Sequence, residues 1–413
     1  MATAPLSPVR TRLRRTVHDI DARTPAHRDR GIDGLRALAL LAVPTGHWLV
    51  GGFTLDADGA LRNASPLSWL GQLAPASWLL QMLGIFFLVG GYASAQSLRR
   101  ATADGRPPGV WLRSRLLRLG RPALAVTAIW AALIPLLLAV GVPATTVRTG
   151  ATLVIQPLWF LGVYAVITAL TPFCTRASRR LGVWAAAPLL ASVAVVDLLR
   201  YGPYADAMPG WLSLLNLLPG WMFAYQIGVS WNERRVSARA AWTLLLGGVA
   251  LFALLLTVFG YPASMVGVPG EARTNSHPPS LLVPALAAAQ SGAAILLRGR
   301  IARLLRRPAL WAPVVLINLS ALTILCWHQT AMLAVAVPGS LFGEVAGLTG
   351  APDSFGWIAA RLAWLPLFAL AFAVIASWTR RFEGPWPGSG RLRGAVAAVL
   401  ASVFAAFALG LMS

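Results

Sequence analysis

Two ionisable residues near the start of the chain could act together in proton-transfer chemistry. Arg36 and His47 are separated by ten residues in the mainly apolar segment DGLRALALLAVPTGHWLVGG. At about 100° per residue, positions eleven apart share one face of an α-helix, roughly 16 Å apart along its axis. Ionisable groups inside a membrane span are costly and usually functional, and imidazole is a common general base. The alternatives are an arginine that snorkels to the interface and a histidine that bridges two helices.

A late apolar segment, residues 310–337, contains several polar side chains: Asn318, Ser320, Thr323, His328 and Gln329. In one continuous helix, Asn318 and Gln329 would share a face and His328 would point about 80° away from it. His328 is a candidate functional residue, and the alternative is that it only completes helix packing. Arg361 lies in the next apolar segment, and we expect a structural role for it.

A basic cluster, WLRSRLLRLGRP, follows the second apolar segment. Its Arg115 and Arg118 are three residues apart and therefore lie on one side of a helical turn. Clustered guanidinium groups suit a ligand that carries phosphates, although ordinary cytoplasmic loop charge is an alternative. No motif of His, Cys, Asp or Glu indicates a metal site.

The composition predicts the element type that positions these residues. The chain is 57% hydrophobic and 12% charged, against about 25% charged in soluble domains. Apolar blocks of roughly 18 or more residues follow one another almost throughout, each long enough to span a bilayer. The ninth block is long enough to tilt or break. We predict an all-α polytopic bundle with eleven spans, at 34–52, 76–96, 122–142, 154–174, 182–198, 210–231, 241–260, 279–297, 310–337, 356–378 and 394–411.

Charge along the chain indicates an orientation. All 35 basic residues are arginines, and the net charge is +21. They cluster in short loops between spans, which argues against a nucleic-acid partner. With a cytoplasmic N-terminus, 29 arginines fall in inner segments and four in outer loops, as the positive-inside rule requires. We therefore expect a plasma-membrane protein with its N-terminus inside and its C-terminus outside.

The chain divides into three regions. Residues 1–30 form a basic cytoplasmic tail that we expect to be disordered, and 31–380 form the membrane domain. Residues 381–413 form a basic inner loop and the last span. Cys174 and Cys326 are too few for a disulfide framework and are predicted to be buried thiols near opposite faces.

Five segments resemble, in order, the motifs of acyltransferase family 3, a family of integral membrane proteins. The first is GIDGLRALALLAVPTGH, with the arginine, ten residues and histidine of the family signature. The others are GIFFLVGGYASAQSL, SRLLRLGRP, PLWFLGVY and LCWHQTAM. The resemblance covers about residues 28–380. It implies a ten-helix acyltransferase core, here followed by an eleventh C-terminal helix.

The resemblance also implies roles for individual residues. His47 would be the catalytic histidine and Arg36 its partner, while Arg115 and Arg118 would bind the anionic donor, acyl-CoA. The remaining candidates would line the cavity or contact the acceptor: His328, Asn318, Trp159 and Tyr92. One position departs from the family pattern, because Gly90 stands where serine is frequent.

The resulting hypothesis is transfer of an acetyl or other acyl group from acyl-CoA to an acceptor hydroxyl. The acceptor would be a sugar, cell-envelope component, lipid or natural product, and no cofactor would be bound permanently. His47 would deprotonate the hydroxyl as it attacks the thioester, or would carry the acyl group itself. The alternative class is a transporter or flippase for a lipid-linked or amphipathic substrate. The acceptor, acyl length and oligomeric state remain open at this point.

Overall fold

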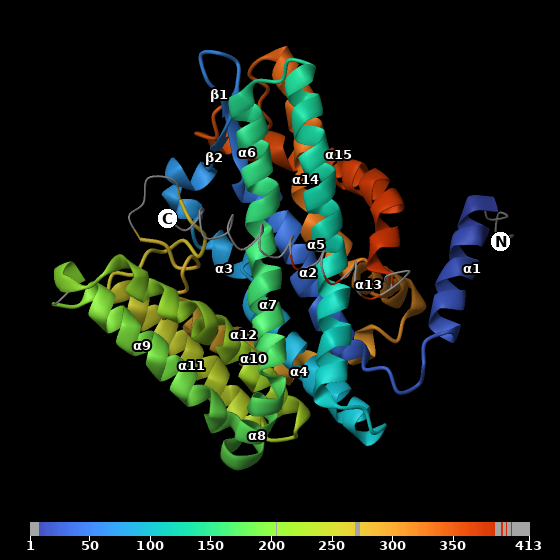
Figure 1. Cartoon of the computed structure of the whole chain (residues 1–413), viewed down its shortest axis with the longest axis vertical. Helices are drawn as coiled ribbons and strands as arrows, with labels where there is room; N and C mark the ends of the chain where they lie inside the picture. The colour runs from blue at the N-terminus through green and yellow to red at the C-terminus, as the bar shows by residue number, and fades with distance from the viewer. Residues whose placement is uncertain are drawn as a thin grey trace, which may run out of the picture.

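Long apolar helices account for most of the residues that the structure describes (Figure 1). The structure is a computed structural model, and it describes residues 8–203, 205–268 and 273–384, with isolated positions 390, 394 and 398. The helices are α1 Pro8–Ala22, α2 Arg30–Val50, α3 Ala76–Leu80, α4 Leu83–Ala103, α5 Pro108–Ala139, α6 Ala144–Ile155, α7 Trp159–Ala169, α8 Thr171–Leu181, α9 Ala187–Tyr201, α10 Leu217–Asn232, α11 Ala238–Thr257, α12 Leu282–Leu304, α13 Pro308–Leu319, α14 Ala321–Gly339 and α15 Phe355–Thr379. One antiparallel hairpin joins α2 to the next helices, with strands β1 Gly52–Leu55 and β2 Leu61–Ala64.

Short 3-10 helices connect or extend several of these elements. They are η1 Pro66–Ser68, η2 Gly71–Leu73, η3 Gln156–Leu158, η4 Gly182–Ala186, η5 Ala205–Ala207, η6 Gly210–Asn216, η7 Ser340–Phe342 and η8 Arg380–Glu383. Within the described residues, nine helical stretches are long and apolar enough to cross a membrane. The predicted all-α polytopic bundle is therefore confirmed.

Helix α2 is too polar to be among those nine stretches, yet it lies near the middle of the molecule (Figure 1). It packs against α4, α12, α13 and α14. Asp29 caps its start, because the carboxylate accepts hydrogen bonds of 3.1 Å from the backbone N–H groups of Gly31 and Ile32. Such a cap satisfies amides that have no partner inside the helix. The polar face of α2 is thus enclosed by other helices.

Several predicted spans have different bounds in the structure; the third, predicted at 122–142, lies mainly in α5, which already begins at Pro108. The fourth crossing runs over Ala144–Ala169, because η3 joins α6 to α7, and the fifth runs over Thr171–Tyr201 through η4. Pro157 and Pro172 both fall in a first turn, where proline is tolerated because its missing N–H is not needed. Segment 171–181 is polar, so hydropathy alone did not assign it to a helix.

The predicted ninth span, 310–337, is two helices rather than one. α13 ends at Leu319 and α14 begins at Ala321, so the axis breaks at Ser320. The side-chain directions predicted for this segment assumed one continuous helix and therefore do not hold across Ser320. The eleventh predicted span, 394–411, lies outside the described residues except at positions 394 and 398.

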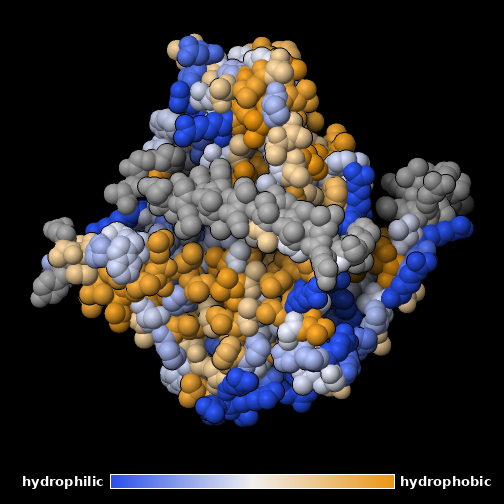
Figure 2. All heavy atoms as spheres, in the orientation of Figure 1, coloured by the Kyte–Doolittle hydropathy of each residue, from blue (hydrophilic) through white to orange (hydrophobic). Residues whose placement is uncertain are grey.

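The outer faces of the bundle are apolar. Figure 2 shows hydrophobic side chains over much of the face formed by α9 and α11, with hydrophilic side chains gathered along the lower edge. On α11, Leu246 and Val249 are 62% and 52% exposed. Side chains of this kind suit contact with lipid, where a soluble protein would place polar groups.

The N-terminal segment differs from the expected disorder, because α1 is helical over Pro8–Ala22. Contacts with other parts of the chain hold the end of α1 and the residues that follow it. Asp21 forms a 2.8 Å ion pair with Arg30, and the indole N–H of Trp311 donates to Thr24 Oγ1 at 2.7 Å. The two cysteines are buried and free, as predicted.

Candidate functional site

A cavity of about 1110 Å³ opens among α2, α4, α5, α7, α13, α14 and the end of α15. Small-molecule sites usually measure roughly 300–1,000 Å³, so this cavity can hold a large ligand. Its lining on α4 extends from Arg100 to Phe86. Fourteen residues of helix correspond to about 21 Å of depth. Seven of the lining residues are arginines: Arg28, Arg36, Arg100, Arg115, Arg118, Arg380 and Arg381.

The acidic residues of the cavity already have partners. They are Asp29, Asp33 and Glu383. Arg28 Nε donates to Asp33 Oδ2 at 2.5 Å, and Arg298 forms an ion pair with Asp29. Glu383 Oε1 accepts from the backbone N–H of Thr323 at 2.7 Å and from its hydroxyl at 2.5 Å. The cavity therefore carries an excess of positive charge suited to phosphate groups.

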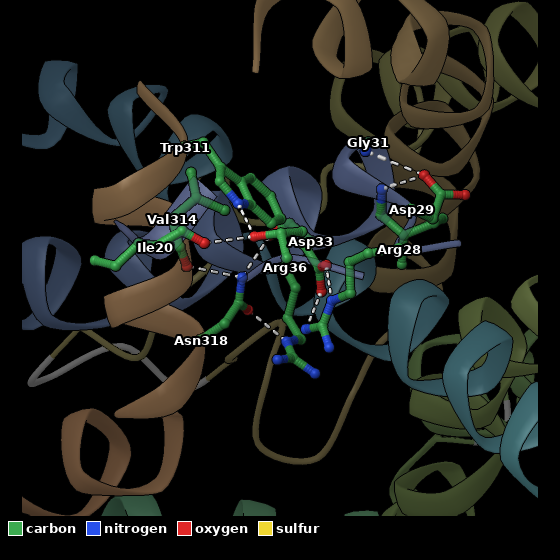
Figure 3. Close-up of polar contacts among 11 residues, drawn as sticks. Ile20, Arg28, Asp29, Gly31, Asp33, Arg36, Trp311, Val314 and Asn318 are labelled. Atoms are coloured by element: carbon green, nitrogen blue, oxygen red, sulfur yellow. Dashed lines mark hydrogen bonds and ion pairs between the residues drawn. The ribbon is translucent and has the colours of Figure 1, made fainter. Parts of the chain in front are cut away.

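Arg36 is held by Asn318 of α13, a residue that is far away in the sequence but in contact with it. Its Nε donates to Asn318 Oδ1 at 2.5 Å. The Asn318 amide donates in turn to the backbone oxygens of Asp33 and Val314, both at 2.9 Å. Figure 3 shows the other two guanidinium nitrogens of Arg36 pointing away from Asn318. Among the described residues these two nitrogens have no hydrogen-bond partner, so they are available to a ligand in the cavity.

Arg115, Arg118 and Tyr92 line the same cavity as Arg36. Arg115 and Arg118 come from α5, and the guanidinium of Arg115 lies 5.9 Å from the Trp111 ring centroid. Tyr92 comes from α4 and packs edge-on against Trp231, with ring centroids 5.1 Å apart. The structure thus brings two of the four arginines of the basic cluster, Arg115 and Arg118, into the cavity that Arg36 lines.

His47 lies beyond the inner end of this cavity. It is not among the lining residues, and it stands eleven residues after Arg36 on α2, which continues through Pro44. Its side chain is exposed. His47 Nδ1 is 3.2 Å from Gln329 Nε2, and the ring centroid is 5.0 Å from that of His328. Helix α2 therefore carries both groups, with Arg36 in the cavity and His47 beyond the inner end of the cavity.

His328 is buried and turns its Nδ1 towards its own helix. That nitrogen lies 3.0 Å and 3.1 Å from the carbonyl oxygens of Ile324 and Leu325, so it must be the N–H donor. Its Nε2 has no partner among the described residues. Gln329, which the sequence did not single out as catalytic, is thus the residue of α14 that reaches His47.

Trp159 also lies outside the cavity lining. Its ring meets His277 edge-on, with centroids 4.9 Å apart. His277 belongs to the loop between α11 and α12, is exposed, and lies near enough to His47 for the two rings to interact electrostatically. Its position depends on the folding of that loop, and no local motif could have indicated it.

Sequence reasoning also missed four of the cavity arginines: Arg28, Arg100, Arg380 and Arg381. It attributed them to the charge of inner segments, because nothing local shows that they meet in space. Within the described residues, no group of three or more His, Cys, Asp or Glu side chains could hold a metal ion.

Arg361 is fully buried and clamps the end of α2. Its Nε donates to the carbonyl oxygen of Trp48 at 2.6 Å, and a terminal nitrogen donates to that of Gly51. Another donates to Gly347 at 3.0 Å. It makes no ion pair with a carboxylate among the described residues. A cation at a helix C-terminus is favourable, so the expected structural role takes this form.

Replacing Arg361 with glutamine is expected to lower the stability of the protein clearly. Each carbonyl left buried without a donor costs about 1–3 kcal/mol. Arg361→Lys should recover only part of the loss, because an ammonium lacks the planar fork of donors. Thermal unfolding in detergent, followed by tryptophan fluorescence, measures the effect. Arg148→Gln, at an exposed position on α6, is the control, and equal midpoints for the two glutamine variants would contradict the clamp.

Comparison with known families gives one match. Residues 29–380 match a family model described as an acyltransferase domain. The match covers most of the chain and includes α2, most of the cavity lining and Arg361. Comparisons with curated proteins and with solved structures found no significant match.

Proposed function

The chain belongs to acyltransferase family 3 and is a multi-pass membrane acyltransferase; from this premise we propose that it moves an acyl group from acyl-CoA to an acceptor hydroxyl, with His47 as general base. The observation that carries the proposal is the placement of Arg36 and His47 on one helix. Arg36 faces a cavity with seven arginines, and His47 stands past the inner end of that cavity.

The charge of the cavity supports acyl-CoA as the donor. Coenzyme A carries three phosphate groups at one end, and a long pantetheine arm separates them from the thioester. Arg115 and Arg118 lie towards the mouth with Arg380. Phosphates bound there would leave the arm directed inward along the polar face of α2. Guanidinium groups bind phosphate through paired, charge-assisted hydrogen bonds.

The reaction requires a base where the hydroxyl meets the thioester. His47 Nε2 takes the hydroxyl proton as the oxygen attacks the thioester carbonyl carbon. The carbon–sulfur bond then breaks, and the coenzyme A thiolate takes up a proton. An acyl-histidine relay is the alternative, in which His47 itself attacks the carbonyl.

Gln329 can set the tautomer of His47. If Nε2 is the base, Nδ1 carries the hydrogen and needs an acceptor. Gln329 Oε1 is buried without a partner among the described residues, while Nε2 of the same amide faces His47 Nδ1. Exchanging the two amide atoms, which differ little in shape, gives Nδ1–H its acceptor.

We further propose that the arginine-lined mouth faces the cytoplasm of the cell, where acyl-CoA is made. The inner segments of the predicted topology supply six of the seven cavity arginines, all except Arg36 in α2. The acceptor would then approach His47 from the opposite side of the membrane, past His277.

The test is acceptor-dependent release of coenzyme A. Purified protein in lipid nanodiscs is mixed with acetyl-CoA and octyl glucoside, and free thiol is followed over time. We expect thiol release that requires both protein and glycoside, with one acetyl group gained by the glycoside in mass spectrometry. A transporter or flippase would release no thiol with this or any other hydroxyl acceptor, and that result would overturn the proposal.

A further inference from the structure

Three aromatic residues form a cluster at the inner part of the cavity: Phe86 of α4 and Phe160 and Tyr164 of α7. All three line the cavity. The ring centroid of Phe86 lies 5.0 Å from that of Phe160 and 5.6 Å from that of Tyr164. The rings of Phe160 and Tyr164 stack with centroids 6.1 Å apart. These separations are those of favourable aromatic pairs, so the three rings support one another.

The aromatic cluster lies where the cavity lining ends on α4 and α7. Phe86 is the deepest lining residue of α4, and Phe160 is the deepest of α7. On the opposite side, the lining ends at Arg36 on α2 and at Leu325 on α14. Gln329, which contacts His47, is one helical turn beyond Leu325. An acyl group that is directed inward along the cavity therefore meets the aromatic cluster.

The three rings have no free space behind them into which they could move. Behind it lies Phe87, which is fully buried and whose ring centroid is 5.1 Å from that of Phe160. Phe87 stacks in turn on the buried ring of Trp221, at 5.6 Å. Because protein interiors are close-packed, displacing Phe160 would require repacking of these rings as well.

Tyr164 packs closely against α4 because Gly90 has no side chain. A Cβ atom added to Gly90 would lie 2.8 Å from Tyr164 Cε2 and 3.0 Å from its hydroxyl oxygen. The Tyr164 ring therefore rests directly against the backbone of α4. Its hydroxyl has no hydrogen-bond partner among the described residues. Gly90 and Tyr164 together therefore set how much space the cavity has beside the ring.

We propose that the aromatic cluster selects the length of the acyl group, with Tyr164 and Gly90 as the specificity-determining pair, so that the donors are short-chain acyl-CoA thioesters such as acetyl-CoA. This inference rests on the proposed function. A rigid apolar wall discriminates against added methylene groups by roughly 10-fold or more for each. Acetyl, with a single methyl group, fits in front of the rings, whereas a long chain would have to displace them.

The test compares acetyl-, butanoyl- and octanoyl-CoA in the thiol-release assay with octyl glucoside. Wild type is expected to prefer acetyl-CoA to octanoyl-CoA by about 100-fold or more in kcat/KM. Tyr164→Ala should reduce that ratio by roughly 10-fold or more. Tyr164→Leu provides an intermediate volume should the alanine variant fold poorly. Tyr164→Phe keeps the ring and should keep the preference, which separates ring volume from the hydroxyl.

A double-mutant cycle tests the pair itself. Gly90→Ala should push Tyr164 into the cavity and lower kcat/KM even for acetyl-CoA, whereas the same change in the Tyr164→Ala background should cost little. Equal use of all donors by wild type, or an unchanged profile in both volume-reducing variants, would overturn the inference while leaving acyl transfer intact. Absence of transfer from every donor would overturn the proposed function and this inference with it.

Discussion

Replacing His47 with glutamine is expected to lower kcat by roughly 10²- to 10⁴-fold, the usual contribution of a positioned general base. Glutamine keeps a polar side chain that can still hydrogen-bond Gln329, but it cannot accept the acceptor's proton at neutral pH. KM for acetyl-CoA should change little, because the cavity arginines are untouched. Thiol release in nanodiscs, measured over a range of donor concentrations, separates the two constants.

A second histidine variant serves as the control. His18 is exposed on α1 and is not among the residues that line the cavity, so His18→Gln should keep wild-type kinetics. A folded His47→Gln protein that keeps more than a tenth of wild-type kcat would refute the role assigned to this imidazole. Labelled acetyl-CoA followed by acid quench distinguishes the chemistries, because only a relay leaves label on the protein.

The double replacement Arg115→Gln with Arg118→Gln is expected to raise KM for acetyl-CoA by about 100-fold or more. A hydrogen bond to a charged group contributes about 1.5–3 kcal/mol, and each 1.4 kcal/mol corresponds to a factor of about ten in affinity. With saturating donor, kcat should remain near that of wild type, because neither arginine approaches the reacting atoms. The measurement is the donor dependence of thiol release.

Arg113 offers a matched control on the same helix. It is exposed and does not line the cavity, so Arg113→Gln should leave KM unchanged. Acetyl-pantetheine, which lacks the nucleotide part of the donor, should be used equally by wild type and the double variant. A similar rise in KM for Arg113→Gln would mean that only the general positive field of the face acts on the donor.

The spacing of Arg36 and His47 was enough to predict that one helix carries both side chains. Helical periodicity fixes that geometry, and Pro44 leaves the helix continuous. The hydrogen-bond partners of Arg36 and His47 could not be predicted from spacing in the same way. The break at Ser320 resets the phase between Asn318 and Gln329, so an argument from one continuous helix placed them on a shared face for the wrong reason.

Long-range arrangement is where the sequence was least informative. Arg380 reaches the same cavity as Arg28 although about 350 residues separate them in the chain. Positive charge near a membrane span has the same appearance whether it sets topology or binds a ligand. His277 reaches the vicinity of His47 only through the fold of its loop. Apolar segments likewise predicted that a crossing exists better than they predicted where it ends. Polar helical segments such as 171–181 continue beyond the apolar part.

The clamp formed by Arg361 has an evolutionary consequence. It ties the last carbonyls of α2 to α15 and to the loop at Gly347, so the backbone around His47 is held by the bundle itself. The hairpin β1–β2 and the loop containing His277 lie outside that anchorage. On the mechanism that we propose, natural variation can therefore remodel these surfaces, and with them the choice of acceptor, while the imidazole keeps its position. A single core of this design can diversify into enzymes for many acceptors without rebuilding its centre.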